Sequence, residues 1–456
     1  MSSDTQKFGI LPTDDPTIVA KVDKNNIDSV REVAAYVHLG DIKGIPQVQS
    51  FLVNKDVITI FMQKYEGDLS QLRPSEKRPY LKEIFWTLAH TLYVAREKNL
   101  IHRDVKPQNV FYSYNSDNQL EVVLGDWGSS VFINSYDHSP RTNIVQTLWY
   151  RAPEVLLHQK GYTDKIDVWS LGLVIAEILR GTPLFKGHNS IDQLFQIFEL
   201  CGTPAEYSDI FPVRNDVRAA YIYTHDDVLL QELLLAMIEL DPTKRFDIYQ
   251  VLSHPYFNKG VYTSTITEQI QNMPMYTPSV EATIYKRQIL DFCRENMVYP
   301  RTFFLACRYI DVILQKDRKV DPWACISLAA RISGESMSDP AFRRNQALEA
   351  LDFACYYFTE LDYAEFLDLK LSPETLAVEM LGETEKVTFR RIPSRLIDPE
   401  RTNLVYGPRY YDRWNKAYRW IRLIDPSLHI DQSPQWKLIG TYVLYPDILI
   451  YKFLEE

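Results

Sequence analysis

Two aspartates and an asparagine in the first half of the chain have the types and spacing of a phosphoryl-transfer site. Asp104 lies in the segment 102–109, His-Arg-Asp-Val-Lys-Pro-Gln-Asn, which ends at Asn109, and Asp126 begins an Asp-Trp-Gly triplet. In this chemistry the protein mainly positions the reactants and neutralises charge, so it needs a carboxylate near the acceptor hydroxyl and oxygen ligands for Mg²⁺. We therefore expect Asp104 to orient and deprotonate the acceptor, and Asn109 and Asp126 to hold the metal.

These residues fall between a β-rich part and a helical part of the chain. Short β-rich runs at 17–22 and 57–62 flank one helical pattern at 27–39. From about residue 81 the sequence has helical periodicity, first at 81–98 and then at 167–180 and 191–201. The sequence therefore predicts an α+β fold in which a small β-rich lobe and a larger helical lobe hold the reactive residues on loops at their junction.

A third motif, Ala-Pro-Glu at residues 152–154, completes a recognisable set. With the segments 102–109 and 126–128 it has the order and spacing of the protein-kinase signature motifs, and the chain resembles a protein kinase. The resemblance implies that Lys21, in Ile-Val-Ala-Lys, contacts the α- and β-phosphates of ATP. It also implies that Glu32, on the predicted helix 27–39, forms the ion pair with Lys21 that kinase activity requires.

Four further segments are similar to cyclin-dependent kinases. They are residues 28–33, 107–109, 147–154 and 191–204, which resemble the cyclin-receiving helix, the catalytic loop, the exit of the activation segment and the helical insert of that group. The resemblance covers about residues 15–257. It implies a bilobal kinase fold with a shortened N-lobe (1–65) and a C-lobe (66–257), which uses ATP and Mg²⁺ and acts on protein substrates.

The resemblance assigns further roles around the catalytic aspartate. Lys106 favours a Ser/Thr kinase, because a cation there neutralises the transferring phosphoryl group, and Thr147 would bridge Asp104 and Lys106. Adenine would lie between Val19 and Phe111, although ordinary apolar packing explains each of these two positions equally well. The full set of positions assigned to ATP by the resemblance is Lys21, Glu32, Val19, Met62 (the gatekeeper), Gln63 and Tyr65 (the hinge), Asp68, Phe111 and Asp126.

Thr142 stands where cyclin-dependent kinases carry their activating phosphothreonine. A phosphate needs arginines to bind it, and Arg31 and Arg103 supply two, whereas the third arginine of the family is Val131 here. Two alternatives follow: either two arginines hold the phosphate, added by an upstream activating kinase, or phosphorylation is dispensable.

The chain departs from the family pattern in three places. No glycine-rich loop precedes Lys21, which should weaken ATP affinity because glycines let the backbone approach the phosphates. Trp127 replaces the usual phenylalanine, which requires a partner for its indole N–H. Gln146 occupies an apolar position of the pocket for the proline after the acceptor, which puts proline-directed specificity in doubt. The alternative to a working enzyme is a kinase-like scaffold or decoy without phosphotransfer.

The second half carries helical text at the spacing of a cyclin box. Segments 286–290, 302–311 and 328–331 carry the resemblance, and a plain helical bundle is the alternative. The predicted organisation is a linker (258–280), a cyclin-box-like all-α domain (281–380) and its extension (381–456). Arg331 is expected to bond carbonyls near the helix of Glu32, with Glu349 or Asp352 as its carboxylate partner. We hypothesise a kinase activated by its own cyclin-like domain through an intramolecular contact.

Composition narrows the remaining choices. A chain of 456 residues with 46% apolar and 24% charged residues is globular and long enough for two or three domains. A net charge of −10 makes nucleic acid a poor partner. The five cysteines share no metal or disulfide spacing. The start is polar and the longest apolar run, 168–179, is too short for a bilayer, so we expect an intracellular soluble protein of the cytoplasm, the nucleus or both, without membrane contact.

Overall fold

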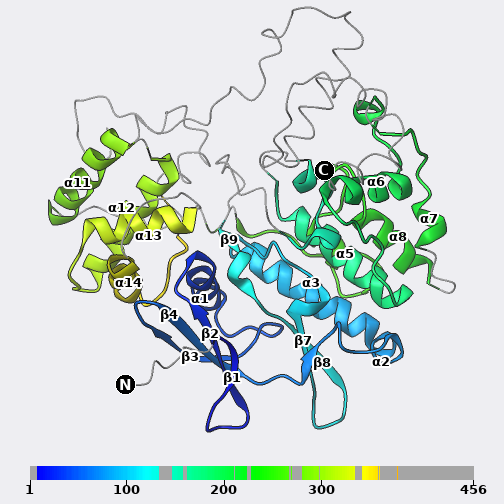
Figure 1. Cartoon of the computed structure of the whole chain (residues 1–456), viewed down its shortest axis with the longest axis horizontal. Coiled ribbons are helices and arrows are strands. Elements are labelled where there is room, and N and C mark those ends of the chain that lie inside the picture. Colours follow the sequence, from blue (N-terminus) through cyan, green and yellow to red (C-terminus); the bar gives the residue numbers. More distant parts are fainter. Residues whose placement is uncertain are drawn as a thin grey trace, which may run out of the picture.

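The computed structural model describes most of the first 357 residues. The described ranges are 8–132, 146–157, 162–209, 211–222, 227–266, 269, 280–296, 298–333, 341–357, 359 and 377. Three parts follow one another along the chain: a small lobe, a large lobe, and a helical region formed by residues 280–357 (Figure 1).

The small lobe is an antiparallel sheet with one helix. The strand order is β1-β2-β4-β3, from β1 (Gly9–Pro12), β2 (Ile18–Lys24), β3 (Val48–Val53) and β4 (Val57–Gln63). Helix α1 (Ile27–Leu39) matches the predicted helix residue for residue. It begins where Asn26 accepts hydrogen bonds from the N–H groups of Asp28 and Ser29, and ends at Gly40, whose φ of 70° favours glycine.

The large lobe is mainly helical, with short strands that carry the loops of the site. Its strands are β5 (Gly67–Asp68), β6 (Leu100–Ile101), β7 (Val110–Tyr114), β8 (Leu120–Leu124) and β9 (Val131–Phe132). Its helices are α2 (Pro74–Lys77), α3 (Leu81–Glu97), α4 (Pro153–Leu156), α5 (Lys165–Arg180), α6 (Ser190–Cys201), α7 (Arg218–Tyr221), α8 (Val228–Met237) and α9 (Ile248–Ser253). The predicted division into a β-rich lobe and a helical lobe is confirmed.

Buried side chains hold the large lobe together around α5. This helix is apolar on nearly all sides, and Trp169 is fully buried in it. The Arg245 guanidinium forms a two-pronged ion pair with Glu154, at 2.6 and 2.9 Å, and both side chains are at most 3% exposed. A buried charge of this kind is stable only when it is paired.

The first part of the predicted linker lies against the large lobe. Glu97, at the end of α3, accepts hydrogen bonds from Thr265 N and Oγ1, and Tyr262 packs edge-on against Tyr93 and Trp86. The contacts leave the chain docked on α3 before α11 begins.

The helical region packs four helices around an apolar centre. They are α11 (Val280–Asn296), α12 (Pro300–Gln315), α13 (Pro322–Ser333) and α14 (Ala341–Ala350). Phe303, Phe304 and Leu328 are fully buried between them, and Lys286 of α11 forms a buried ion pair with Asp311 of α12 at 2.8 Å. Figure 1 shows α1 lying between the sheet of the small lobe and helix α13, with α14 beside the ends of β3 and β4.

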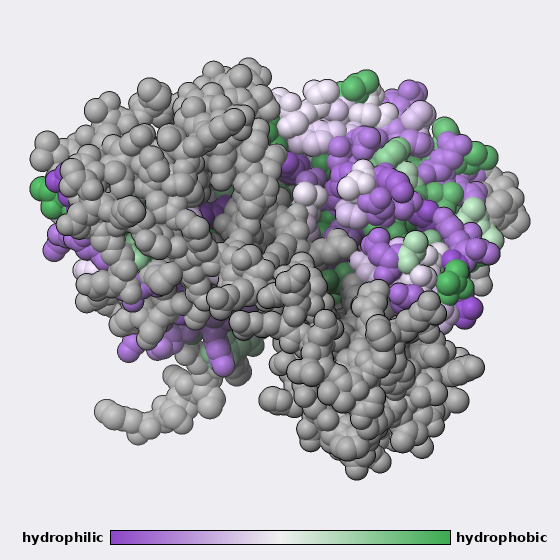
Figure 2. Space-filling view, turned by 90° about the horizontal axis from the view of Figure 1, so that it is seen from above, coloured by the Kyte–Doolittle hydropathy of each residue, from purple (hydrophilic) through white to green (hydrophobic). Residues whose placement is uncertain are grey.

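The surface is polar in the part that can be followed. Figure 2 shows hydrophilic residues over much of the coloured area of one face, with hydrophobic residues in small separate patches. None of the described helices combines the length and the apolar character that crossing a membrane needs. The five cysteine thiols are all buried.

Candidate active site

The loop after β6 brings Asp104, Lys106 and Thr147 into one hydrogen-bonded cluster. Lys106 Nζ lies 2.6 Å from Asp104 Oδ2 and 2.8 Å from Thr147 Oγ1. Thr147 donates to Asp104 Oδ1 from its backbone N–H at 2.8 Å and from its hydroxyl at 3.0 Å. The carboxylate is therefore held in one orientation by a cation and by a residue 43 positions away.

The charge of Asp104 is set by opposing effects. Burial disfavours its ionised form, but the hydrogen bond and the charge of Lys106 outweigh burial and lower the pKa of Asp104.

His102 holds the backbone of the catalytic loop through both nitrogens of its ring. Its Nδ1 accepts from Asp104 N–H at 3.1 Å, so its proton is on Nε2, which donates to the Gly125 carbonyl at 2.9 Å. Burial lowers the pKa of His102 and keeps the ring neutral.

Asn109 and Asp126 are placed so that each keeps an oxygen for a cation. Asn109 Nδ2 donates to the Asp104 carbonyl at 2.8 Å and to Asp104 Oδ2 at 3.1 Å, which leaves its amide oxygen as the coordinating atom. The Asp126 side chain is 43% exposed. Within the described ranges no three His, Cys, Asp or Glu side chains form a metal cluster. Two protein ligands suit Mg²⁺, because this ion keeps several waters and takes further oxygens from substrate phosphates.

Lys21 joins the two lobes. Its Nζ lies 2.8 and 2.7 Å from the two oxygens of Glu32 and 3.1 Å from Asp126 Oδ1. Burial lowers the pKa of Lys21, but the charges of Glu32 and Asp126 outweigh it and hold the pKa above its usual value. Burial raises the pKa of Glu32 to about 7, against the opposing effect of Lys21. The arrangement is the one in which α1 is turned inward.

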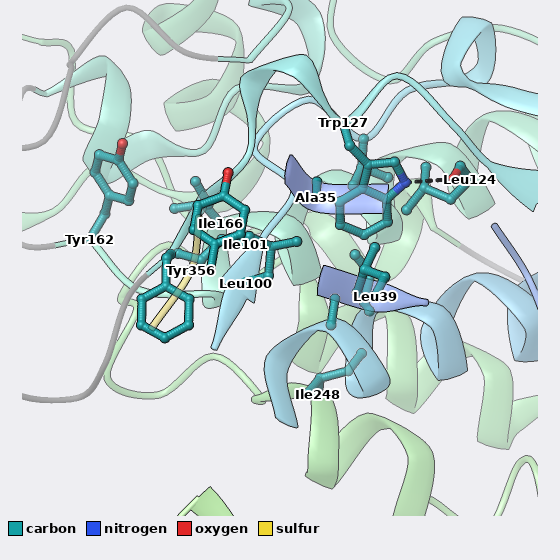
Figure 3. Close-up of a cluster of buried hydrophobic side chains, with 14 of the residues drawn as sticks. Ala35, Leu39, Leu100, Ile101, Leu124, Trp127, Tyr162, Ile166, Ile248 and Tyr356 are labelled. Atoms are coloured by element: carbon teal, nitrogen blue, oxygen red, sulfur yellow. Dashed lines mark hydrogen bonds between the residues drawn. The ribbon is translucent and has the colours of Figure 1, made fainter. Parts of the chain in front are cut away.

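Trp127, the residue after Asp126, anchors the turn that carries this aspartate. Its indole is fully buried and donates to the Leu124 carbonyl at 2.8 Å, which is the partner that the larger ring requires. Figure 3 shows the indole beside Ala35 and Leu39 of α1, and its ring lies edge-on to His102 at 4.5 Å. Asp126 itself has a left-handed backbone (φ 56°). The position thus couples α1 to the loop of His102.

The positions assigned to ATP lie around the strands that meet at the lobe junction. Val19 pairs with Met62 in the sheet, and Met62 is buried, whereas Val19 is only partly buried. The Phe111 ring stacks on Tyr65 at 5.9 Å. Two positions are already engaged within the protein: the Gln63 N–H donates to the Gln47 carbonyl at 2.9 Å, and the Asp68 carboxylate accepts from Ser70 and Gln71.

Gln146 lies in the large lobe with a left-handed backbone, φ 65°. Its side chain is 6% exposed and binds Ser170 Oγ at 2.7 Å and the Ala152 N–H at 2.9 Å. Its carbonyl accepts from the Arg151 guanidinium at 2.9 Å. The polar groups of the Gln146 side chain therefore bond within the large lobe. The sequence could not predict this, because it does not show where the side chain points.

Arg31 and Arg103 lie near each other, as a shared phosphate site requires. Both are buried, and burial together with the charge of Arg103 lowers the pKa of Arg31 to about 10. Arg103 donates to the Ser129 carbonyl at 2.6 Å and to the Tyr162 hydroxyl at 2.9 Å. Val131 is in β9, paired with Ile101. Thr142 lies outside the described residues.

The helical region contacts α1 mainly through residues that the sequence did not point to. Arg31 Nη2 donates to the carbonyls of Arg331 and Ile332, at 3.3 and 3.4 Å, so Arg331 contributes its backbone to this contact. The Glu349 side chain is exposed, and its pairing with Arg331 stays a prediction. Asp352, the alternative partner, binds Lys316 and Arg318 instead.

Other side chains carry the contact. Asn345 of α14 accepts from Asn25 Nδ2 at 3.0 Å and donates to the Asn54 carbonyl at 3.2 Å. Arg301 donates to the Phe132 carbonyl at 2.6 Å. Tyr356 stacks on the Phe132 ring at 5.7 Å. Each contact is made by an isolated residue that belongs to no sequence motif, so the sequence carried no indication of it.

Comparison with known proteins agrees with this geometry. Residues 17–257 match the family described as the protein kinase domain. This is more than half of the chain, which therefore belongs to the protein kinase family.

Two curated relatives narrow the likeness. One is "Serine/threonine-protein kinase ppk23" of Schizosaccharomyces pombe, 33% identical over 252 residues, which are 51% of this chain. The other is "Cell division control protein 2 homolog 3" of Trypanosoma brucei brucei, 33% identical over 199 residues, which are 40% of this chain. The matched segment covers 61% of the length of each relative.

Proposed function

We propose that this protein is a Mg²⁺- and ATP-dependent Ser/Thr protein kinase of the cyclin-dependent type, and that its helical region acts as a cyclin-like activator in cis. The observation that carries the proposal is the joined set of contacts from Glu32 through Lys21 to Asp126. This set joins α1 to β2 and to the Asp-Trp-Gly turn, and the helical region contacts the same helix at Arg31, next to Glu32.

The residues of the catalytic loop divide the chemistry between them. Asp104 orients the acceptor hydroxyl and receives its proton. Lys106, 2.6 Å from Asp104, is the cation that neutralises the transferring phosphoryl group. Lys21 binds the α- and β-phosphates. A Mg²⁺ ion held by Asn109 and Asp126 would neutralise charge on the phosphate oxygens.

The two relatives support the class of substrate. One is named a Ser/Thr kinase and the other a homologue of a cell division control protein. The link between Lys106 and Thr147 Oγ1 at 2.8 Å holds the cation beside the acceptor site, which fits a Ser/Thr acceptor. Protein substrates and an intramolecular contact with the helical region are therefore the partners that we propose.

The first experiment measures transfer of labelled γ-phosphate from Mg-ATP to a Ser/Thr peptide library. We expect transfer by the full chain, and its loss in Asp126→Asn, because the metal loses a charged ligand. The peptide pattern will show whether a proline after the acceptor is read beside Gln146. A folded wild-type chain that transfers no phosphate, with or without an upstream kinase, would leave a scaffold as the better description.

A second experiment tests activation in cis. Asn345→Arg places a long charged side chain at a position 8% exposed that contacts Asn25 and Asn54. We expect activity to fall at least tenfold, while the unfolding of the large lobe is unchanged. Gln346→Arg, one residue on and exposed, is the matched control and should stay active. Equal activity of both variants would contradict the role of this contact.

A further inference from the structure

The buried arginine pair, Arg31 and Arg103, meets the helical region at a junction that also includes His38, Phe132 and Tyr356. Two buried cations close together need acceptors, because an uncompensated buried charge is strongly destabilising. In proteins of this family type a phosphate would be the obvious acceptor, so the question is what neutralises the pair in this chain.

Helix α13 supplies acceptors for Arg31. The carbonyls of Arg331 and Ile332, which Arg31 contacts, are in its last turn. Carbonyls there have no partner within the helix and carry the negative end of its dipole. A guanidinium placed at this end gains both the hydrogen bonds and the favourable field, as it would from an anion.

The large lobe supplies acceptors for Arg103. Its Nε donates to the Ser129 carbonyl and its Nη1 to the Tyr162 hydroxyl. Arg103 also has a left-handed backbone (φ 68°), held by its N–H bonded to Asp167 at 2.9 Å. The side chain is thus fixed at both ends, and it reaches acceptors of its own lobe.

Tyr356 closes the junction. It is 5% exposed, stacks almost parallel on Phe132 (9° between the rings) and lies edge-on to His38 of α1 at 5.4 Å. The Arg301 guanidinium donates a hydrogen bond to the Phe132 carbonyl and lies 5.8 Å from the centre of the Phe132 ring. One aromatic side chain of the helical region therefore ties the end of α1 to the strand that follows the Asp-Trp-Gly turn.

The phenol also lies within the field of both arginines. Burial raises the pKa of Tyr356 to about 12, while the interaction with the Ser130 hydroxyl and the charges of Arg31 and Arg103 oppose this rise. Among the described residues, Arg31 Nε is buried without a hydrogen-bond partner. An anion placed near Arg31 and Arg103 should therefore stabilise the protein only if these two charges lack sufficient acceptors.

We propose that the helical region takes the place of a phosphorylated residue at this junction: carbonyls at the end of α13 accept the hydrogen bonds of Arg31, Tyr356 is the positioning residue that packs α1 against Phe132, and activity needs no phosphate on Thr142. The inference rests on the proposed function and specifies its regulation. It chooses between the two alternatives that the residues Thr142, Arg31 and Arg103 leave open.

The experiment compares full-length variants by γ-phosphate transfer and by the midpoint of thermal unfolding. Thr142→Ala should keep activity within twofold of the wild type, and Thr142→Glu should not raise the midpoint. Tyr356→Leu should lose about tenfold activity, a typical size for a coupling between two sites. In that background Thr142→Glu should restore part of the activity and raise the midpoint by about 2 °C, which a merely structural loss would not allow.

Two controls separate the contributions. Tyr356→Phe keeps the ring and removes the hydroxyl, so it should stay close to the wild type if stacking positions Phe132. Tyr357→Leu removes the neighbouring aromatic ring, which packs near Tyr309, and should show no dependence on Thr142→Glu.

The outcomes are distinct from those of the proposed function. A chain that transfers phosphate but loses more than tenfold activity in Thr142→Ala overturns the inference and leaves the proposed function standing. A chain that transfers no phosphate overturns the proposed function. The unfolding midpoints of the variants then decide by themselves whether the inference holds. Stabilisation of the wild type by Thr142→Glu would show an unmet need for an anion and overturn the inference.

Discussion

The catalytic loop and the contact between the small lobe and the helical region are both polar, but they are built in opposite ways. In the loop, Asp104, Lys106 and Asn109 lie within six residues and meet through charged groups at 2.6 to 3.1 Å. At the contact, Asn25 and Asn345 are 320 residues apart and meet through neutral amides at 3.0 Å.

The difference follows from what each region must do. Phosphoryl transfer requires a base, a cation and metal ligands in fixed geometry, so few residue types are acceptable and they recur as a motif. A contact that holds a helix inward requires only complementary shape and satisfied hydrogen bonds, which many residue pairs provide. The first region should therefore respond steeply to a single change and the second in small steps.

The steepest response is expected at Asp104. Asp104→Asn removes the group that accepts the proton of the acceptor, a contribution worth about 10²–10⁴-fold in rate. We expect kcat to fall about 10³-fold, while Mg-ATP still raises the unfolding midpoint because Lys21 and Asp126 remain. A variant that loses stabilisation by Mg-ATP as well would mean that Asp104 supports the fold of the site rather than the chemistry.

The contact between the small lobe and the helical region should give a smaller and shared effect. Asn25→Ala removes one hydrogen bond between the two parts and Asn345→Ala removes two, and each bond is worth about 1 kcal/mol, or fivefold in activity. Because the two residues share one of these bonds, the double variant should lose much less than the product of the two single losses. Activities of all four chains measure this coupling, and strictly multiplicative losses would show that the residues act independently.

The same contrast explains what could be predicted from the sequence. The bounds of α1 follow from a helical pattern, and the Lys21–Glu32 pair follows from a motif in which charge and spacing are restricted. The partner of Arg331, Glu349 or Asp352, could not be fixed from the sequence, because a shift of one residue along a helix turns a side chain by about 100°. Tyr356 and Asn345 depend on how distant helices meet, which no local pattern encodes.

Trp127 stands between the two regions and tests their connection. Trp127→Phe removes the hydrogen bond to the Leu124 carbonyl and part of the volume beside α1. Leaving that buried carbonyl unsatisfied should cost about 1–3 kcal/mol of stability. We expect a lower unfolding midpoint and about a fivefold loss of activity. Leu124 pairs with Val110 in the adjoining strands, so Val110→Ala, which reduces buried volume but keeps the hydrogen bond from the indole, is a suitable control.

The pH dependence of Glu32 should be the mildest and most specific effect. The pKa of Glu32 is raised from 4.5 to about 7 by burial. Between these values the native state binds a proton that the unfolded state does not, so the stability from this group is greatest below the lower value and is lost as the pH rises through 7.

Activity should change in the opposite direction, because the ion pair with Lys21 requires ionised Glu32. From pH 7.5 to pH 6.5 the ionised fraction of a group with this pKa falls about threefold, and kcat/KM should follow it. Glu32→Gln should be less active throughout and lose this acid limb. If kcat/KM of Glu32→Gln still falls at acid pH as in the wild type, another group is responsible for the titration. The dependence of stability on pH would then show whether the charge of Lys21 already keeps Glu32 ionised.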